Sequence, residues 1–228
     1  MAYALNYRHM SEAFAGGTLT DGKNQVRCQV HELGQLVVTS GSIAASDPLV
    51  DPTPRPFQQR IPNGSHSVAV AVACYEGGDE RVAFARVRLT ETSPITWTMA
   101  TTFGQDTATL KADEYFGYGV DAGTGCFMDP RAGDLLSARM DEESEFYNVI
   151  TGGMDATYRH TWSWFDFTPV DGPPENIICF SSGFGDGSYP SFFGFDAQGA
   201  VCALVTDFCL FYEPQAPVLS QPWWKFWR

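Results

Sequence analysis

The segment at residues 66–75, HSVAVAVACY, alternates valine and alanine more regularly than any other part of the chain. In an extended strand this period of two places Val68, Val70, Val72 and Cys74 on one face and small alanines on the other. The pattern therefore predicts a β-strand over these ten residues, with one broad apolar face and one face of small side chains.

Further β-favouring runs lie on both sides of this strand. Residues 26–39 contain two alternating runs around Leu33 and Gly34, which predicts a hairpin. Residues 81–89 and 95–101 follow the first strand after Gly77 and Gly78, so the three runs predict an antiparallel meander. Short β-like segments at 176–182, 192–196 and 200–212 are separated by glycine and aspartate turns.

Helical signals occur in the middle of the chain. Asp129 before Pro130 is typical of an N-cap followed by proline at the first helical position. Leu135, Leu136 and Met140 supply an apolar face, and a second helical stretch over 142–150 is expected to stop at Gly152 and Gly153. Between residues 48 and 62, five prolines predict a fixed irregular connection.

These elements favour an α+β fold class, mainly antiparallel β as a meander or sandwich, with a helical segment near 130–150. A length of 228 residues fits one β-rich domain over 1–228. The last residues, 221–228 (QPWWKFWR), form a short aromatic tail, which either packs back onto the domain or sits in a partner groove or membrane interface.

The charge balance restricts the class of partner. The chain has 14 basic and 27 acidic residues, a net charge of −13, so it should repel nucleic-acid phosphates. Solubility accounts for this acidity, and a basic protein partner is the alternative. Residues 1–14 show no secretory signal pattern, and no stretch approaches the roughly 20 apolar residues of a membrane span. Six irregularly spaced cysteines favour free thiols, and the expected location is the cytoplasm.

Four stretches carry a resemblance to a known family: SGSIAASDPL at 40–49, YFGYGVDAGTGCFMD at 115–129, YRHTWSWFDF at 158–167, and the region from FSSGFGDGSYP to TDF at 180–208. In this order they resemble the bacterial domain of unknown function family 4241, over about residues 34–211. The resemblance implies that these loops matter, and it implies no reaction, ligand or fold.

The same loops hold the candidate functional residues. Asp121 and Asp129 flank the turn Gly123-Thr124-Gly125, which could bring both carboxylates to one side of a loop. A second loop, at 182–189, presents Asp186 between glycines. Carboxylates on such loops suit Mg²⁺ or Ca²⁺, or they serve as acid and base, but aspartates in Asp-Gly turns also commonly do no more than cap the local backbone.

Several well-known catalytic and nucleotide-binding sequence motifs are absent. The chain contains no dinucleotide-binding GxGxxG, no phosphate-binding loop, no GxSxG elbow and no HExxH pair. The leading hypothesis is therefore a domain that binds or hydrolyses a polar small molecule, with or without a divalent metal. The alternative is a non-enzymatic acidic interaction module of the immunity or adaptor type, covering a basic partner.

The leading hypothesis assigns a role to each candidate. The catalytic candidates are Asp121, Asp186, Ser182 and Tyr189; the ligand-binding candidates are Asp47, Arg60, Thr124 and Gly185; and the metal candidates are Asp121 and Asp129.

Overall fold

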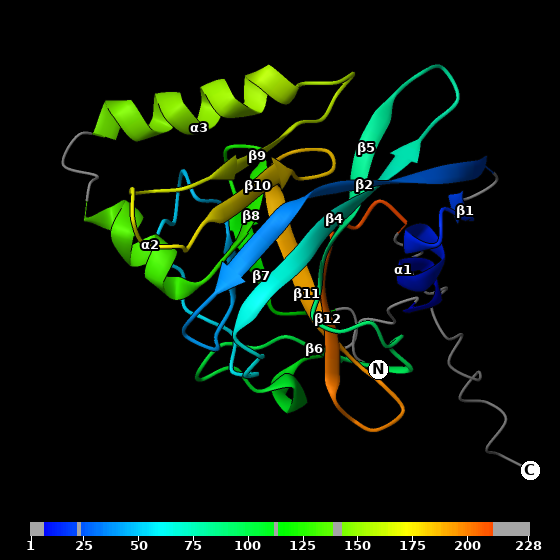
Figure 1. Cartoon of the computed structure of the whole chain (residues 1–228). Helices are drawn as coiled ribbons and strands as arrows, with labels where there is room; N and C mark the ends of the chain where they lie inside the picture. Colours follow the sequence, from blue (N-terminus) through cyan, green and yellow to red (C-terminus); the bar gives the residue numbers. More distant parts are fainter. Residues whose placement is uncertain (1–6, 22–23, 112–113, 139–142, 212–228) are drawn as a thin grey trace, which may run out of the picture.

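The computed structural model describes residues 7–21, 24–111, 114–138 and 143–211. Met140 and the aromatic tail at 221–228 lie outside these ranges, so the expectations for them stay predictions. The described chain has an α+β fold built on two antiparallel β-sheets, with helices on their outer sides (Figure 1). The predicted fold class is thereby confirmed, and of its two β arrangements the structure adopts the sandwich.

The larger sheet has eight strands in the order β1-β2-β4-β5-β12-β11-β6, with β7 also paired to β11. Its strands are β1 (Thr18–Asp21), β2 (Asn24–Val38), β4 (Gly64–Cys74), β5 (Glu80–Arg88), β6 (Thr96–Met99), β7 (Gly117–Val120), β11 (Gly187–Phe195) and β12 (Val201–Asp207).

The smaller sheet has four strands in the order β3-β8-β10-β9: β3 (Ala44–Ser46), β8 (Thr124–Met128), β9 (Trp164–Phe167) and β10 (Ile177–Ser181). The helices α2 (Pro130–Ser137) and α3 (Glu143–Thr157) lie against it (Figure 1). Leu136 from α2 and Ile150 from α3 are buried together with Met128 and Ile177 of the strands. This second apolar cluster joins the two helices to the outer face of the smaller sheet.

The main core lies between the two sheets. The valine face of β4, Val68, Val70 and Val72, is fully buried, and it belongs to one apolar cluster with Phe127 and Phe180 of the smaller sheet. Burying such aliphatic and aromatic side chains is the dominant favourable contribution to folding. The valine and alanine alternation therefore predicted the strand that lies at the centre of the core.

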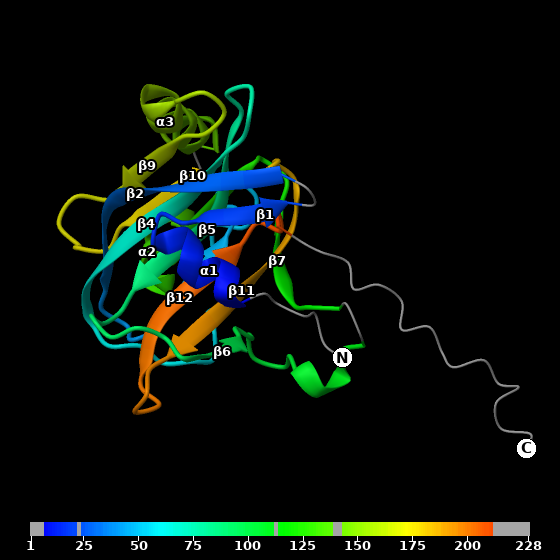
Figure 2. The ribbon, with the colours of Figure 1, turned by 90° about the vertical axis from the view of Figure 1, so that its right-hand side faces the viewer.

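The alanine face of β4 has a different role. The helix α1 (Tyr7–Phe14) crosses the outer side of the larger sheet, where it contacts β1, β2 and β4 (Figure 2). Ala69 and Ala71 are buried there, and so are Met10 and Ala13 of the helix. Small side chains on this face let the helix approach the sheet closely.

The predicted hairpin at 26–39 is wrong. Residues 24–38 form one continuous strand, β2, which pairs with β4 from Arg27↔Cys74 to Val38↔Gly64. The register shifts between Glu32 and Gly34, which marks a β-bulge. A bulge inserts one residue and changes which side chains face inward, so it produces the same break in alternation as a turn.

The predicted three-stranded meander is correct only for its first two strands. β4 and β5 are antiparallel neighbours, but β6 pairs with β11 at the far side of the sheet. Two strands from the end of the chain, β12 and β11, separate β5 from β6.

The predicted stop at Gly152 and Gly153 is also wrong, because α3 continues through both glycines to Thr157. A Cβ atom at residue 153 would lie 2.4 Å from Cγ of Phe165 on β9. The glycine is needed for close contact between helix and sheet, and this tertiary packing outweighs its poor helix propensity. No helix in the described part of the chain is long and apolar enough to span a membrane.

Candidate functional site

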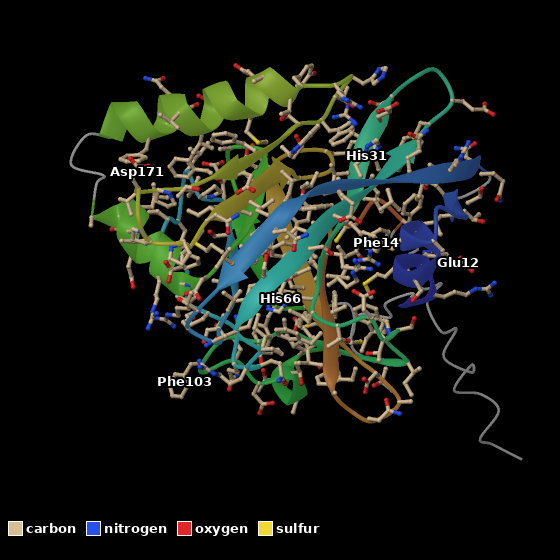
Figure 3. The ribbon with its side chains drawn as sticks, viewed as in Figure 1. Glu12, Phe14, His31, His66, Phe103 and Asp171 are labelled. Carbon is tan, nitrogen blue, oxygen red and sulfur yellow. The ribbon has the colours of Figure 1, made fainter. Side chains whose placement is uncertain are left out.

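A cavity of about 570 Å³ opens where β7 and β11 meet the proline-rich segment that follows β3. Its size lies within the range of small-molecule sites. The lining combines charged and polar side chains with aromatic rings: Ser46, Asp51, Arg55, Phe57, Thr102, Gln105, Phe116, Tyr118, Asp121, Tyr189 and Ser191 are among its residues. Phe103, next to the lining residue Thr102, is 86% exposed and is labelled in Figure 3.

Asp47 fixes the backbone at one side of this cavity. Its carboxylate is completely buried and accepts hydrogen bonds from the backbone N–H groups of Leu49, Asp121 and Ala122, at 3.1, 3.1 and 2.7 Å. Burial raises the pKa of Asp47, while the three N–H donors act in the opposite direction by stabilising the ionised form. Asp47 therefore holds the 121–123 segment, through which the chain passes from the larger sheet to the smaller one.

The charged side chains of the cavity come from two separate segments. Asp121 follows β7, whereas Asp51 and Arg55 belong to the proline-rich connection, and all three are exposed. The backbone N–H of Asp51 donates to the carbonyl oxygen of Asp47 at 2.8 Å, so Asp47 anchors both segments. Two carboxylates and one guanidinium thus face one cavity.

The two glycine loops predicted to form the site do lie side by side. The N–H of Ser182 donates to the carbonyl oxygen of Gly123 at 3.1 Å, and a Cβ at Gly123 would lie 4.0 Å from Cα of Gly185. The hydroxyls of Ser182 and Tyr189 both donate to the Gly185 carbonyl, at 2.9 and 2.8 Å. These bonds shape the second loop.

Only part of the predicted set lines the cavity. Asp121 and Tyr189 do so, and burial raises the pKa of the Tyr189 phenol. The predicted residues Asp47, Ser182, Thr124, Gly185 and Asp186 are not among the lining residues. Thr124 donates its hydroxyl to the carbonyl of Ala122 at 3.3 Å, and Asp186 is exposed on the second loop.

Arg60 and Asp129 meet at a different place, the turn after β2. The Asp129 carboxylate accepts N–H bonds from Thr39 and Ser40 at 2.8 and 2.7 Å, and from Arg131 at 2.9 Å as the N-cap of α2. The guanidinium of Arg60 donates to the carbonyl of Ser40 and the hydroxyl of Ser42. Both side chains are engaged in holding this turn.

The predicted pairing of Asp121 with Asp129 on one side of a loop is wrong. The five residues of β8 lie between the two carboxylates, and a strand of that length spans roughly 17 Å. Among the described residues no group of three or more histidine, cysteine, aspartate or glutamate side chains is placed to hold a metal ion. A Mg²⁺ or Ca²⁺ site stays an untested prediction.

Asp51, Arg55 and Gln105 line the cavity although they are not among the predicted site residues. The Oε1 atom of Gln105 accepts the N–H of Thr102 at 2.8 Å, and the residue lines the cavity. A signal for the first two was present, because charged residues directly before Pro52 and Pro56 are held on a rigid, irregular backbone. The prolines by themselves predict only an irregular connection.

Comparison with known proteins supports the predicted resemblance. The model of a family described as "Protein of unknown function (DUF4241)" matches residues 36–206, which include β7, β11 and the proline-rich segment. No curated protein sequence matches the chain, and no solved structure does.

Proposed function

The chain belongs to the DUF4241 family, and we propose that it binds a polar small molecule with a positively charged group in the cavity between β7 and the proline-rich segment. The observation that carries the proposal is the presence of Asp51, Asp121 and Arg55 around one cavity of ligand size. A concave site with a few convergent polar groups is the usual form of a small-molecule site.

The charges favour a zwitterionic ligand. Two carboxylates would bind an ammonium group, while Arg55 would bind a carboxylate through its planar guanidinium. Phe57 and the ring of Tyr118 line the same cavity and offer apolar surface. An amino acid or a related amine therefore fits the lining better than a neutral sugar or a simple anion.

The site also has the support that ligand binding needs. Asp47 holds the backbone of both Asp51 and Asp121 through hydrogen bonds within the protein. A preformed site loses less conformational freedom on binding, which increases affinity.

The test is a thermal-unfolding screen with the twenty free amino acids and putrescine, together with acetate and glucose as probes lacking the ammonium group. A probe at about 100 times its Kd stabilises a protein by roughly 2.7 kcal/mol. For a chain of this length that raises Tm by about 5–10 °C. At least one amine-bearing probe should give such a shift, and acetate and glucose should not.

Two matched variants make the screen specific. Asp121→Asn should abolish the shift because it removes a cavity carboxylate, whereas Asp186→Asn should retain it because that exposed carboxylate lies outside the lining. Absence of a shift with every probe, or equal loss in both variants, would contradict the proposal.

Hydrolysis is the enzymatic form of this proposal. Asp51 and Asp121 share one cavity, and a positioned carboxylate can act as a general acid or base toward a bound substrate. Asp51→Asn should then remove turnover of a hydrolysable ligand, such as an amide or ester of the amino acid that binds, while leaving its binding measurable by calorimetry.

The net charge of −13 favours a second candidate, an acidic module that covers a basic protein. Such binding would weaken steeply with salt and would be unaffected by Asp121→Asn, because a broad charged face does not depend on one cavity residue. Salt titration of any copurifying basic protein distinguishes the two functions.

A further inference from the structure

A second cavity, of about 500 Å³, lies on the outer side of the larger sheet, between α1 and the connection from β5 to β6. It shares no lining residue with the first cavity. Figure 3 shows the separation: Phe14 lies on α1, and Phe103 lies beside the first cavity on another side of the molecule.

Arg86 provides the most unusual group in this cavity. It projects from β5 on the same face as its register partner Ala69, so its guanidinium lies beneath α1 and its Cζ is 4.1 Å from the centre of the Phe14 ring. Its Nε atom is buried and has no hydrogen-bond partner in the described part of the chain. The Arg86 side chain as a whole is half-buried, and a guanidinium partly removed from water gains from an anionic partner, since its desolvation is otherwise uncompensated.

No acidic side chain of the described residues compensates this charge directly. Glu32 lies in the same row two strands away, across Ala69, and forms no ion pair with Arg86. Burial lowers the pKa of the Arg86 guanidinium, Glu32 raises it and Arg88 lowers it, but an arginine remains charged near neutral pH. The Phe14 ring offers cation–π attraction, which does not satisfy the Nε–H.

The rest of the lining shows which kind of ligand could pair with the Arg86 guanidinium. Arg88 lies two residues along the same strand and forms an ion pair with Glu91 at 3.3 Å, so these three charged side chains leave one net positive charge. The hydroxyls of Ser11, Thr92 and Ser93 add hydrogen-bonding groups. Met10, Phe14, Pro94 and Trp97 form an apolar wall beside them.

We propose that this cavity binds a small organic carboxylate, whose negative group pairs with Arg86 and whose apolar body lies against Phe14 and Trp97. A monoanion neutralises the single positive charge, whereas the second charge of a phosphate dianion would face Glu91. The apolar wall contributes only if the ligand has an apolar body, because a hydrated inorganic ion gains nothing from it. The planar guanidinium matches the geometry of a carboxylate.

The test is calorimetric titration of the full chain with sodium benzoate, inorganic phosphate and benzyl alcohol at constant ionic strength. Benzoate should bind, phosphate should bind at least tenfold more weakly, and the uncharged alcohol should not bind measurably. Arg86→Met, which keeps the apolar length of the side chain and removes the charge, should weaken benzoate binding at least tenfold.

Arg81→Met is the matched control. Arg81 lies on the same strand with its Cζ 5.4 Å from the centre of an aromatic ring, Phe184, but it is paired with Asp79 at 3.0 Å and lies outside the cavity. This control should retain benzoate binding. If Arg86→Met fails to fold, Arg86→Gln takes its place, since it removes the charge at the same position and keeps hydrogen-bonding groups there.

The unliganded stability gives an independent readout. Because Arg86→Met removes a half-buried charge whose Nε–H has no partner in the described part of the chain, its Tm without ligand should equal or exceed that of the wild type, unlike that of a variant that loses a structural interaction. The proposal is overturned if benzoate does not bind, if phosphate binds as tightly, or if Arg81→Met weakens benzoate as much as Arg86→Met does.

Discussion

Two buried aspartates of this protein show how the same side chain is treated differently by its surroundings. Asp47 has three backbone N–H donors at its carboxylate, whereas the carboxylate of Asp207, at the end of β12, accepts one backbone N–H bond, from Cys209 at 2.7 Å. Burial raises the pKa of Asp207 to about 7, and the single Cys209 bond only partly opposes this effect. Asp207 is therefore protonated in the folded protein over a pH range where it is ionised in the unfolded chain.

The pH dependence of the free energy of unfolding follows from the direction of this pKa shift. The stabilising contribution of Asp207 is fully present below the unfolded pKa of 3.8 and is lost as the pH rises through about 7. Asp207→Asn, which mimics the protonated form, should match the wild type at pH 4 and exceed its free energy of unfolding by pH 8. The difference in free energy of unfolding between the variant and the wild type should reach at most about 4 kcal/mol. Denaturant titrations from pH 4 to 8 measure it.

Asp196 is the control, because its pKa is shifted in the opposite direction to that of Asp207. Hydrogen bonds from Ala200, Thr92 and Gln198 lower the pKa of its carboxyl, so its contribution is present at neutral pH and is lost in acid. Asp196→Asn should therefore be destabilising at pH 7 and progressively less so below pH 4. A flat pH profile of the Asp207→Asn difference would contradict the assignment.

At the scale of elements, α3 shows how two adjacent glycines can have opposite roles. Gly152 has nothing within 4 Å of the place a Cβ would occupy, whereas at Gly153 that atom would lie 2.4 Å from Cγ of Phe165. Gly152→Ala should stabilise the protein by about 1 kcal/mol through helix propensity. Gly153→Ala should destabilise it by roughly 1–3 kcal/mol through overpacking. Thermal unfolding of the two variants compares them directly, and equal stabilisation by both would show that α3 does not pack against β9 as described.

Elements with a local cause were predictable from the sequence. The alternation of Val68, Val70 and Val72 predicts β4, and Asp129 before Pro130 predicts the start of α2. Both predictions are possible because side-chain period and helix capping depend on residues only a few positions apart. The bulge in β2 and the continuation of α3 depend on contacts with β4 and β9, which are distant in sequence. The insertion of β12 and β11 between β5 and β6 is a long-range pairing of the same kind.

The candidate site was predictable to a similar degree. The glycine loops identified Asp121 and Tyr189, which line the first cavity. Asp51 and Arg55 reach that cavity only because the proline-rich segment crosses to β7, and no local pattern records this crossing. Asp129 illustrates the opposite error, since a helix N-cap and a metal ligand have the same residue type and sequence context.

At the scale of the whole molecule, the charge of −13 has a consequence for stability as well as for partners. A compact chain with 27 acidic and 14 basic residues is destabilised by its own repulsion. The described ion pairs offer little opposing attraction. Arg8–Glu12, Arg88–Glu91 and Lys111–Glu114, for example, are all largely exposed, and such pairs are worth about 0–1 kcal/mol each.

Salt should therefore stabilise this protein. Raising NaCl from about 0.05 to 0.5 M shortens the screening length below 10 Å and weakens repulsion more than it weakens the few exposed pairs. We expect a Tm increase of about 2–4 °C, which corresponds to roughly 1 kcal/mol for a chain of this size. Repeating the series near pH 4.5, the isoelectric point, supplies the control, since the net charge and with it the salt effect should nearly vanish. A fall in Tm with salt at pH 7 would instead mean that specific ion pairs outweigh the net repulsion.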